Sequence, residues 1–429
     1  MNSLRLLLAS ALLLTSVITT AAAEQTDRAQ RQLLSDGWLL KSSVLVPEDG
    51  ARVSTVGFKP QQWLKTSVPC TVLSALVKNG VYPDPRIGMN SFLIPDSSDE
   101  FNRKHDLAKF SYLPDKRNPW RDPYWYRTEF KMPAVAPGRH LWLNFKGINY
   151  RAEVWLNGKR VADQKEMVGI YRRFRFDITA CARPGANCLA VKIHPVDHPG
   201  EPDTQLKPLG PSRSYFKKEI QKDVTYAVAV GYDCMPPIPD RNMGIWQDVF
   251  LEWTGPVDIR DPFVATDLPL PDTSRATLTV SAELVNASAL SVRGVLRGRV
   301  VGAEVCFEQS VELAPNETKF VCVEPKPVMR QPRLWWPKNY GEQSLYELKL
   351  EFEVRSPGFS RSEASSVTPR SRPPVGGTPN LSTERTITFG VRTVGKELHK
   401  LGDHYGAAGS SRSFCSICRR AAWRPKSVT

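Results

Sequence analysis

A strict alternation of apolar and charged residues in the stretch "SLYELKLEFEVR", residues 344–355, restricts the possible folds of this chain most. Its apolar residues stand two apart, and the positions between them carry glutamate or lysine; they are Leu348, Leu350, Phe352 and Val354. A period of two places all the apolar side chains on one face of an extended chain. The stretch therefore predicts a β-strand with one buried face.

Similar segments recur along the chain, and turn-forming residues separate them. They are 124–132, 139–147, 151–163, 187–195, 244–253, 275–286 and 385–394. Asn157-Gly158, inside the third of these segments, is a strong hairpin signal because both residues accept the positive φ of a type I′ turn. Thirty-five prolines and 27 glycines also favour short strands and turns over long helices. The chain is therefore predicted to be all-β.

One short helix is predicted, over residues 71–79. Thr71 can cap its start, and Gly80 can end it. The apolar residues expected on one face of this helix are Val72, Leu73, Leu76 and Val77.

The predicted strands form two groups that meet near Pro256. The first group, in residues 24–255, fits a jelly-roll sandwich, and the second, in residues 256–395, fits an immunoglobulin-like sandwich. Within the second group, residues 355–384 are rich in Ser, Pro, Gly and Arg, and we expect a flexible loop there. Residues 396–429 show neither the period of a strand nor that of a helix, and they are predicted to be an irregular tail.

The N-terminus has the pattern of a secretory signal peptide over residues 1–23. Arg5 precedes a short apolar run, and Ala21-Ala22-Ala23 stands before Glu24 as a small-residue cleavage pattern. A membrane anchor is the alternative, but the run is short for a spanning helix. We therefore expect a secreted or periplasmic protein that has no membrane contact after cleavage.

The net charge of +14 at pH 7 raises the question of nucleic-acid binding. The basic residues are scattered among acids without a basic helix or zinc-finger spacing, so we expect a solvated cationic surface and no nucleic-acid partner.

Eight cysteines leave several disulfide patterns open in an exported protein. Cys306 and Cys322 lie on the two arms of a predicted hairpin, and Cys181 and Cys188 flank a short loop. Cys415 and Cys418 have redox or metal spacing, but no second pair accompanies them.

Six stretches together resemble a known family, and they occur in that family's order. They are "TVLSALVKNGVYPDP" (71–85), "PYWYRTEF" (123–130), "FKGINYRAEVWLNG" (145–158), "GYDCMPPIPDRNMGIWQDV" (231–249), "LWWPKNYGEQSLYEL" (334–348) and "FGVRTV" (389–394). The chain resembles the N-terminal half of glycoside hydrolase family 2. Within that family it resembles the branch of the exo-β-glucosaminidases and β-mannosidases, which includes the plant endo-β-mannosidases.

The resemblance implies a sugar-binding-like jelly roll, an immunoglobulin-like domain and then a (β/α)₈ barrel that holds two catalytic glutamates about 5 Å apart. Only 37 residues follow Arg392, whereas a barrel takes about 250. We therefore expect no catalytic barrel and no catalytic residue in this chain. Asn316-Glu317 is similar to the family's Asn-Glu pair, but it falls in a predicted hairpin turn. The tail suggests a frameshift or an early gene-model end.

The resemblance also implies a sugar-contacting aspartate on a jelly-roll loop, and Asp233 occupies that position. Tyr232 precedes it, and Cys234 stands where an aromatic residue is usual. A carboxylate accepts two hydroxyl hydrogens, and a neighbouring ring can stack on a sugar. The alternative for Asp233 is a turn aspartate or a partner of Arg241. Asp84, in "YPDP", is either a residue of the same site or a turn residue.

The remaining candidate residues are expected to have structural roles. Arg241 and Asn242 are expected to shape the loop under Asp233, and Trp155 is expected in the sheet core. Trp335 and Trp336 are expected to pack between domains. His194 and His198 have a spacing that suits a metal only on a helix, which the prolines of "HPVDHP" prevent. We therefore expect no metal and no cofactor.

The sequence favours the N-terminal part of a secreted family-2-type glycosidase, truncated and inactive alone, that faces a β-linked oligosaccharide or polysaccharide. The alternative is a stand-alone carbohydrate-binding or interaction module. Such a module could pair with a separately encoded barrel.

Overall fold

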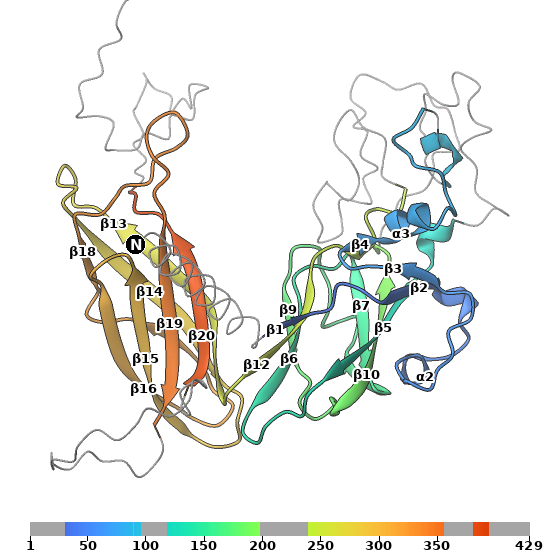
Figure 1. The fold of residues 1–429 in the computed structure, drawn as a ribbon, viewed down its shortest axis with the longest axis horizontal. Helices are drawn as coiled ribbons and strands as arrows, with labels where there is room; N and C mark the ends of the chain where they lie inside the picture. The colour runs from blue at the N-terminus through green and yellow to red at the C-terminus, as the bar shows by residue number, and fades with distance from the viewer. Residues whose placement is uncertain (1–30, 89, 96–117, 198–238, 356–380, 394–429) are drawn as a thin grey trace, which may run out of the picture. The chain divides into compact units, whose positions relative to one another are not determined.

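The computed structural model describes residues 31–88, 90–95, 118–197, 239–355 and 381–393 (Figure 1). The chain divides into two compact units, one up to Trp253 and one from Thr254. This division lies close to the boundary expected at residue 255. The signal peptide 1–23 and the tail 396–429 lie outside the described residues, so both stay predictions. In the described part, no helix is long and apolar enough to cross a membrane.

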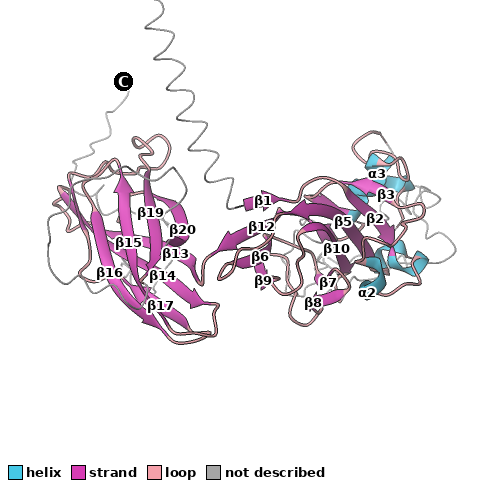
Figure 2. Ribbon diagram, turned by 60° about the horizontal axis from the view of Figure 1, so that its bottom comes forward, coloured by secondary structure: helices cyan, strands magenta, loops and turns pink. Residues whose placement is uncertain are grey.

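Unit 1 is a sandwich of two sheets (Figures 1 and 2). The four-stranded sheet has the order β1 (Arg31–Leu33), β12 (Val249–Thr254), β6 (His140–Phe145), β9 (Phe174–Asp177). The six-stranded sheet has the order β3 (Leu64–Thr66), β2 (Trp38–Ser42), β5 (Tyr124–Met132), β10 (Gly185–His194), β7 (Arg151–Leu156), β8 (Lys159–Ala162). Buried residues of both sheets, such as Leu143 from β6 and Tyr126 from β5, belong to one apolar core. The antiparallel sandwich expected for the first domain is confirmed.

A short pair of strands and a few short helices complete unit 1. The pair joins β4 (Cys70–Thr71) to β11 (Gly244–Ile245). The helices are η1 (Ser43–Leu45), α2 (Gly50–Val53), α3 (Val72–Lys78), η2 (Asn90–Leu93) and η5 (Pro119–Arg121).

The helix predicted over 71–79 is confirmed as α3. The Thr71 hydroxyl accepts a hydrogen bond from the Ser74 backbone N–H, and Gly80 has a φ of 71° just beyond the helix. Ala75, which was not among the residues expected on the buried face, is fully buried, whereas Val77, which was expected there, is only partly buried. The hairpin at Asn157-Gly158 is also confirmed, with positive φ at both residues between β7 and β8.

Unit 2 is a second sandwich (Figure 2). One sheet has the order β13 (Val257–Asp267), β14 (Arg275–Asn286), β17 (Thr318–Cys322), and β18 (Val328–Arg330) also pairs with β14. The other has the order β16 (Cys306–Leu313), β15 (Val292–Val301), β19 (Tyr346–Val354), β20 (Leu381–Phe389). The strand with one buried face predicted from the alternation in residues 344–355 is confirmed, because Leu348, Leu350 and Phe352 are fully buried.

Edge strands from the two sheets of unit 2 are linked by polar contacts. The Asp258 carboxylate, on β13, is completely buried and accepts a hydrogen bond from Arg385 on β20 at 2.6 Å. The Ser382 hydroxyl accepts from the Val257 N–H at 2.7 Å and donates to the Val257 carbonyl at 2.6 Å. These contacts hold β13 beside β20.

Two expectations about unit 2 are wrong. The loop expected over 355–384 ends earlier, because β20 begins at Leu381; residues 356–380 lie outside the described residues. The arms of Cys306 and Cys322 form no hairpin, because β16 and β17 belong to different sheets. Both thiols are free.

The second bridge that the sequence left open, between Cys181 and Cys188, is not formed. Cys181 and Cys188 are both free, and Cys188 is fully buried. Cys234, Cys415 and Cys418 lie outside the described residues.

Candidate functional site

The described part of the candidate site is a turn at residues 239–244, packed against the start of α3. Tyr232 and Asp233 lie outside the described residues, which resume at Pro239, six residues after Asp233. The Met243 carbonyl accepts a hydrogen bond from the Val72 N–H at 2.8 Å, and β11 pairs with β4 just before α3. The C-terminal base of the segment that carries Asp233 is therefore fixed.

A buried carboxylate, Asp240, joins this turn to the helix. One oxygen accepts from the Leu73 N–H at 2.9 Å, and the other accepts from the Asn242 N–H at 2.9 Å. A carboxylate at a helix start satisfies amides that have no partner inside the helix. Burial raises the pKa of the Asp240 carboxyl to about 6, although its hydrogen bonds favour the charged form. Nothing in the sequence distinguished Asp240 from the other aspartates of this stretch.

Arg241 and Asn242 bend the chain sharply at this place. Their φ values are 52° and 56°, in the left-handed region. Their carbonyls accept hydrogen bonds at 2.7 and 3.0 Å from the side-chain amide of Asn149, which is itself fully buried. The prediction that these two residues shape the loop holds for its described end. The anchoring role of Asn149 was missed.

Gly244 allows the turn to approach the start of α3. Its φ is 147°, and a Cβ at this position would lie 2.7 Å from Thr71 Cα and 2.8 Å from the Tyr126 hydroxyl oxygen. That hydroxyl donates to the Cys70 carbonyl at 3.0 Å, so it has no room to move away freely. Only glycine fits this close approach of two backbone segments.

Asp84 follows α3 on a turn, and its carboxylate is held by Arg86. The Arg86 Nη2 atom lies 2.7 Å from one carboxylate oxygen, and the Arg86 N–H donates to the other at 3.0 Å. The side-chain hydrogen bond from Arg86 lowers the pKa of Asp84 to about 2. These contacts are those expected if Asp84 is a turn residue, and its contact with a sugar stays a prediction.

The aromatic candidates occupy structural positions. Trp155 is half-buried and packs over Gly50 of α2, close to the expected core position. The Trp335 backbone N–H donates to the Val391 carbonyl at 3.0 Å, and the Trp335 ring lies under the Arg392 guanidinium, whose central carbon is 4.7 Å from the ring centre. Its expected interdomain role stays a prediction. His194 pairs with Glu153 at 2.8 Å, whereas His198 lies outside the described residues.

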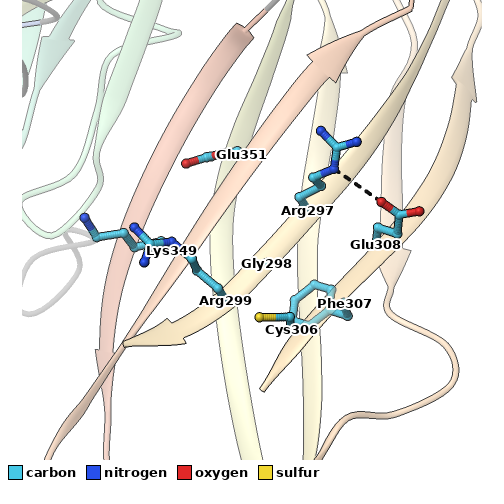
Figure 3. A pocket seen from close by; sticks show the side chains of 8 residues that line it. All are labelled: Arg297, Gly298, Arg299, Cys306, Phe307, Glu308, Lys349 and Glu351. Atoms are coloured by element: carbon cyan, nitrogen blue, oxygen red, sulfur yellow. Dashed lines mark hydrogen bonds and ion pairs between the residues drawn. The ribbon is translucent and has the colours of Figure 1, made fainter. Parts of the chain in front are cut away.

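Two glutamates share a surface hollow of about 380 Å³ in unit 2, but their geometry does not suit glycoside cleavage (Figure 3). Glu308 and Glu351 lie on β16 and β19, and Arg297 of β15 is the cross-strand partner of both. Two strand spacings put their backbones about 10 Å apart, against about 5 Å between the carboxyl groups of retaining glycosidases. Arg297 also pairs with Glu308 at 3.3 Å.

Asn316-Glu317 is a turn, but it connects β16 and β17 of different sheets and is not the predicted hairpin turn. Asn316 has a φ of 57°, and the Glu317 carboxylate accepts from the Ala314 N–H at 2.7 Å. The described residues form no (β/α)₈ barrel.

The two antiparallel sandwiches place this chain in a class of protein domains that accompany glycosidases. Residues 107–247 match the glycosyl hydrolase 2 galactose-binding domain-like family, and residues 257–362 match the family described as glycosyl hydrolases family 2. The chain belongs to glycoside hydrolase family 2, of which it carries the N-terminal sugar-binding-like and immunoglobulin-like domains.

Relatives of this chain include two kinds of named enzyme. The mannosylglycoprotein endo-β-mannosidase of Lilium longiflorum is 34% identical over 349 residues, which are 78% of this chain and 33% of the lily protein. The exo-β-D-glucosaminidase of Streptomyces avermitilis is 32% identical over 74% of this chain and 30% of that protein. The chain therefore spans about a third of the length of the curated relatives it matches.

A solved structure is similar over the same region. The exo-chitosanase CsxA of Amycolatopsis orientalis superposes with a TM-score of 0.62 at 28% identity, over 86% of this chain and 34% of that one. The resemblance found from the sequence is thus confirmed.

Proposed function

We propose that this chain is the carbohydrate-facing, non-catalytic N-terminal part of an exported glycoside hydrolase of the β-glucosaminidase or β-mannosidase type, and that it does not hydrolyse glycosides alone. The observation that supports this most is the fixed turn at 239–244. Asp240 ties it to α3, and Asn149 ties it to the segment that precedes β7; the turn begins six residues after the position expected to contact sugar.

The proposed lack of hydrolysis rests on the matched domains and on the carboxylates. Both matched domains are the non-catalytic ones of the family. Two of the three buried acids in the described residues have arginine partners: Glu252 pairs with Arg31 at 2.8 Å and with Arg175, and Asp258 pairs with Arg385 at 2.6 Å. The third, Asp240, is held by the backbone amides of Leu73 and Asn242. An arginine partner keeps a carboxyl ionised and therefore makes it a poor proton donor, whereas glycoside cleavage needs a protonated acid beside the nucleophile.

Hydrolysis is tested with the purified chain on the p-nitrophenyl β-glucosaminide and β-mannoside. We expect no release of p-nitrophenol above the uncatalysed rate. Release at enzymatic rates, on the order of 1 per second or more, would contradict the proposal.

Carbohydrate contact is tested by calorimetry with chitosan and mannan oligosaccharides. We expect dissociation constants of about 1 mM or weaker, because a site with only one wall leaves most of the sugar in water. Micromolar binding would favour the alternative, a stand-alone carbohydrate-binding module.

Asp233→Ala should abolish this weak binding. The matched control Asp272→Ala removes an exposed turn aspartate of unit 2, whose carboxylate accepts from the Ser274 N–H at 2.8 Å, and should change nothing. Asp84→Ala tests the second predicted contact in the same assay.

Export is tested by expressing the whole chain in a secreting host. We expect a secreted product whose first residue is Glu24. A product that stays in the cell with residues 1–23 attached would contradict this part of the proposal.

A further inference from the structure

The outer face of the sheet β16-β15-β19-β20 in unit 2 carries a ladder of opposite charges. Arg293 pairs with Glu312 at 3.0 Å, and Arg297 pairs with Glu308 at 3.3 Å and with Glu353. Opposite charges in facing positions of neighbouring strands stabilise a sheet. These two arginines of β15 are therefore neutralised by carboxylates of the adjacent strands.

The next position of the ladder breaks this rule. Arg299 of β15 faces Lys349 of β19 on one side and Cys306 of β16 on the other. Within the described part of the chain, neither Arg299 nor Lys349 forms a hydrogen bond or ion pair with a carboxylate. Like charges in facing positions stand about 5 Å apart at Cβ and destabilise the pair.

This cationic pair borders the surface hollow of about 380 Å³ described above. Figure 3 shows the Arg299 and Lys349 side chains next to each other, and Cys306 on the opposite side of Arg299 from Lys349. The carboxylate of Glu351 lies on the same face, two positions along β19 from Lys349. The hollow thus offers cationic donors beside a carboxylate acceptor.

We propose that Arg299 and Lys349 form a binding site for a tetrahedral oxyanion, a sulfate or phosphate group carried by a sugar. The guanidinium presents two parallel N–H donors and the ammonium presents further ones, which matches the several oxygens of such a group. A bound anion converts the repulsion between the two cations into attraction to both. Glu351 accepts from a sugar hydroxyl, which favours an ester over the free ion. The oxyanion site does not depend on the proposed function, whereas the sugar that carries the oxyanion rests on it.

The site is tested on the whole chain through the exposed thiol of Cys306. Labelling by the uncharged reagent N-ethylmaleimide is followed by mass spectrometry of the Cys306 peptide, with glucosamine 6-sulfate, inorganic sulfate, inorganic phosphate or glucosamine present. Sodium chloride keeps the ionic strength equal. We expect glucosamine 6-sulfate to slow labelling several-fold at saturation, and glucosamine and chloride to have no effect.

Two variants and a matched control locate the site. Lys349→Gln and Arg299→Gln should each lower the affinity of the protecting ligand about tenfold, because each removes a charge-assisted contact. Arg293→Gln removes a cation from the same strand and face, but one that is already paired with Glu312, and it should leave protection unchanged. Without ligand, Lys349→Gln should melt at the same or a higher temperature than the wild type at low salt, because it relieves the repulsion.

The outcomes distinguish three cases: a site for the sugar ester, the same site with a free ion, and no site at all. Stronger protection by the sugar sulfate supports the ester, and equal protection by inorganic sulfate or phosphate supports the same site with a free ion. Labelling that no anion slows in the wild type overturns the site. Protection that is equally strong in Lys349→Gln, Arg299→Gln and the wild type also overturns it.

Discussion

The Asp240 carboxylate accepts a hydrogen bond from the Leu73 backbone N–H at 2.9 Å and so joins two residues 167 positions apart. The contact attaches the turn at 239–244 to the first turn of α3. It also buries an acid completely, with backbone amides rather than a paired cation as its nearest donors. The stability of the site should therefore depend on the charge of one carboxyl group.

Asp240 should make the free energy of unfolding depend on pH. Burial raises the pKa of this carboxyl from 3.8 to about 6 in the folded chain. Between these values the folded state binds more protons than the unfolded state, so stability falls as the pH rises from about 4 to about 6. Asp240→Asn removes this titration. The stability advantage of the wild type over the variant should shrink by about 3 kcal/mol between about pH 4 and about pH 7.

Chemical denaturation of both proteins across this pH range measures the difference, and Asp84→Asn serves as the control. The pKa of Asp84 is lowered to about 2, so its stabilising contribution is present above pH 3.8 and is lost only in more acidic solution. The Asp84 variant should therefore run parallel to the wild type from pH 4 upward. A pH-independent difference between wild type and Asp240→Asn would contradict the account.

Gly244→Ala should destabilise unit 1 by about 2 to 4 kcal/mol, because the added methyl group meets backbone and the φ of 147° is strained for alanine. Two matched glycines separate clash from strain. A Cβ at Gly80 meets nothing within 4 Å but has a φ of 71°, so Gly80→Ala should cost only about 1 kcal/mol. A Cβ at Gly57 meets nothing and has no positive φ, so its change should be near zero. Urea titrations give the three values, and equal losses would sink the interpretation.

The parts of the fold that the sequence predicted are those governed by local period and local turn chemistry. The strand at Tyr346–Val354 and the hairpin at Asn157-Gly158 are examples. The alternation of apolar side chains selects the buried face by itself. Which strand pairs with which is a different matter. β15 pairs with β16 and β19, whereas β17 crosses to the other sheet, and that choice depends on the packing of the whole sandwich.

The candidate site was less predictable for a similar reason. Arg241 and Asn242 stand in a stretch whose prolines already indicate a turn. The residues that hold this turn, Asn149 and Leu73, are distant in the chain. No periodicity indicates a contact between a loop aspartate and the backbone N–H of a helix residue 167 positions earlier in the chain.

Alkylation under native, non-reducing conditions should label Cys306 first and Cys188 last. Cys306 is exposed, whereas Cys188 is fully buried and its burial raises the pKa of the thiol to about 12. A buried thiol that stays protonated is a poor nucleophile. Iodoacetamide labelling with peptide mass spectrometry measures the order. A Cys306–Cys322 disulfide in the unreduced protein would show that the strand assignment of β16 and β17 is wrong.

Asp258→Ala should destabilise unit 2 by about 3 to 5 kcal/mol, because it leaves the guanidinium of Arg385 without its carboxylate in a buried place. The matched control is Glu312→Ala, which breaks an ion pair whose side chains are 75% and 59% exposed and should cost at most about 1 kcal/mol. Thermal unfolding followed by near-ultraviolet circular dichroism compares the two variants. Double substitution with Arg385→Met should recover part of the loss, since the uncompensated charge is then removed. If both single variants lose the same stability, the buried ion pair between β13 and β20 does not stabilise unit 2 as proposed.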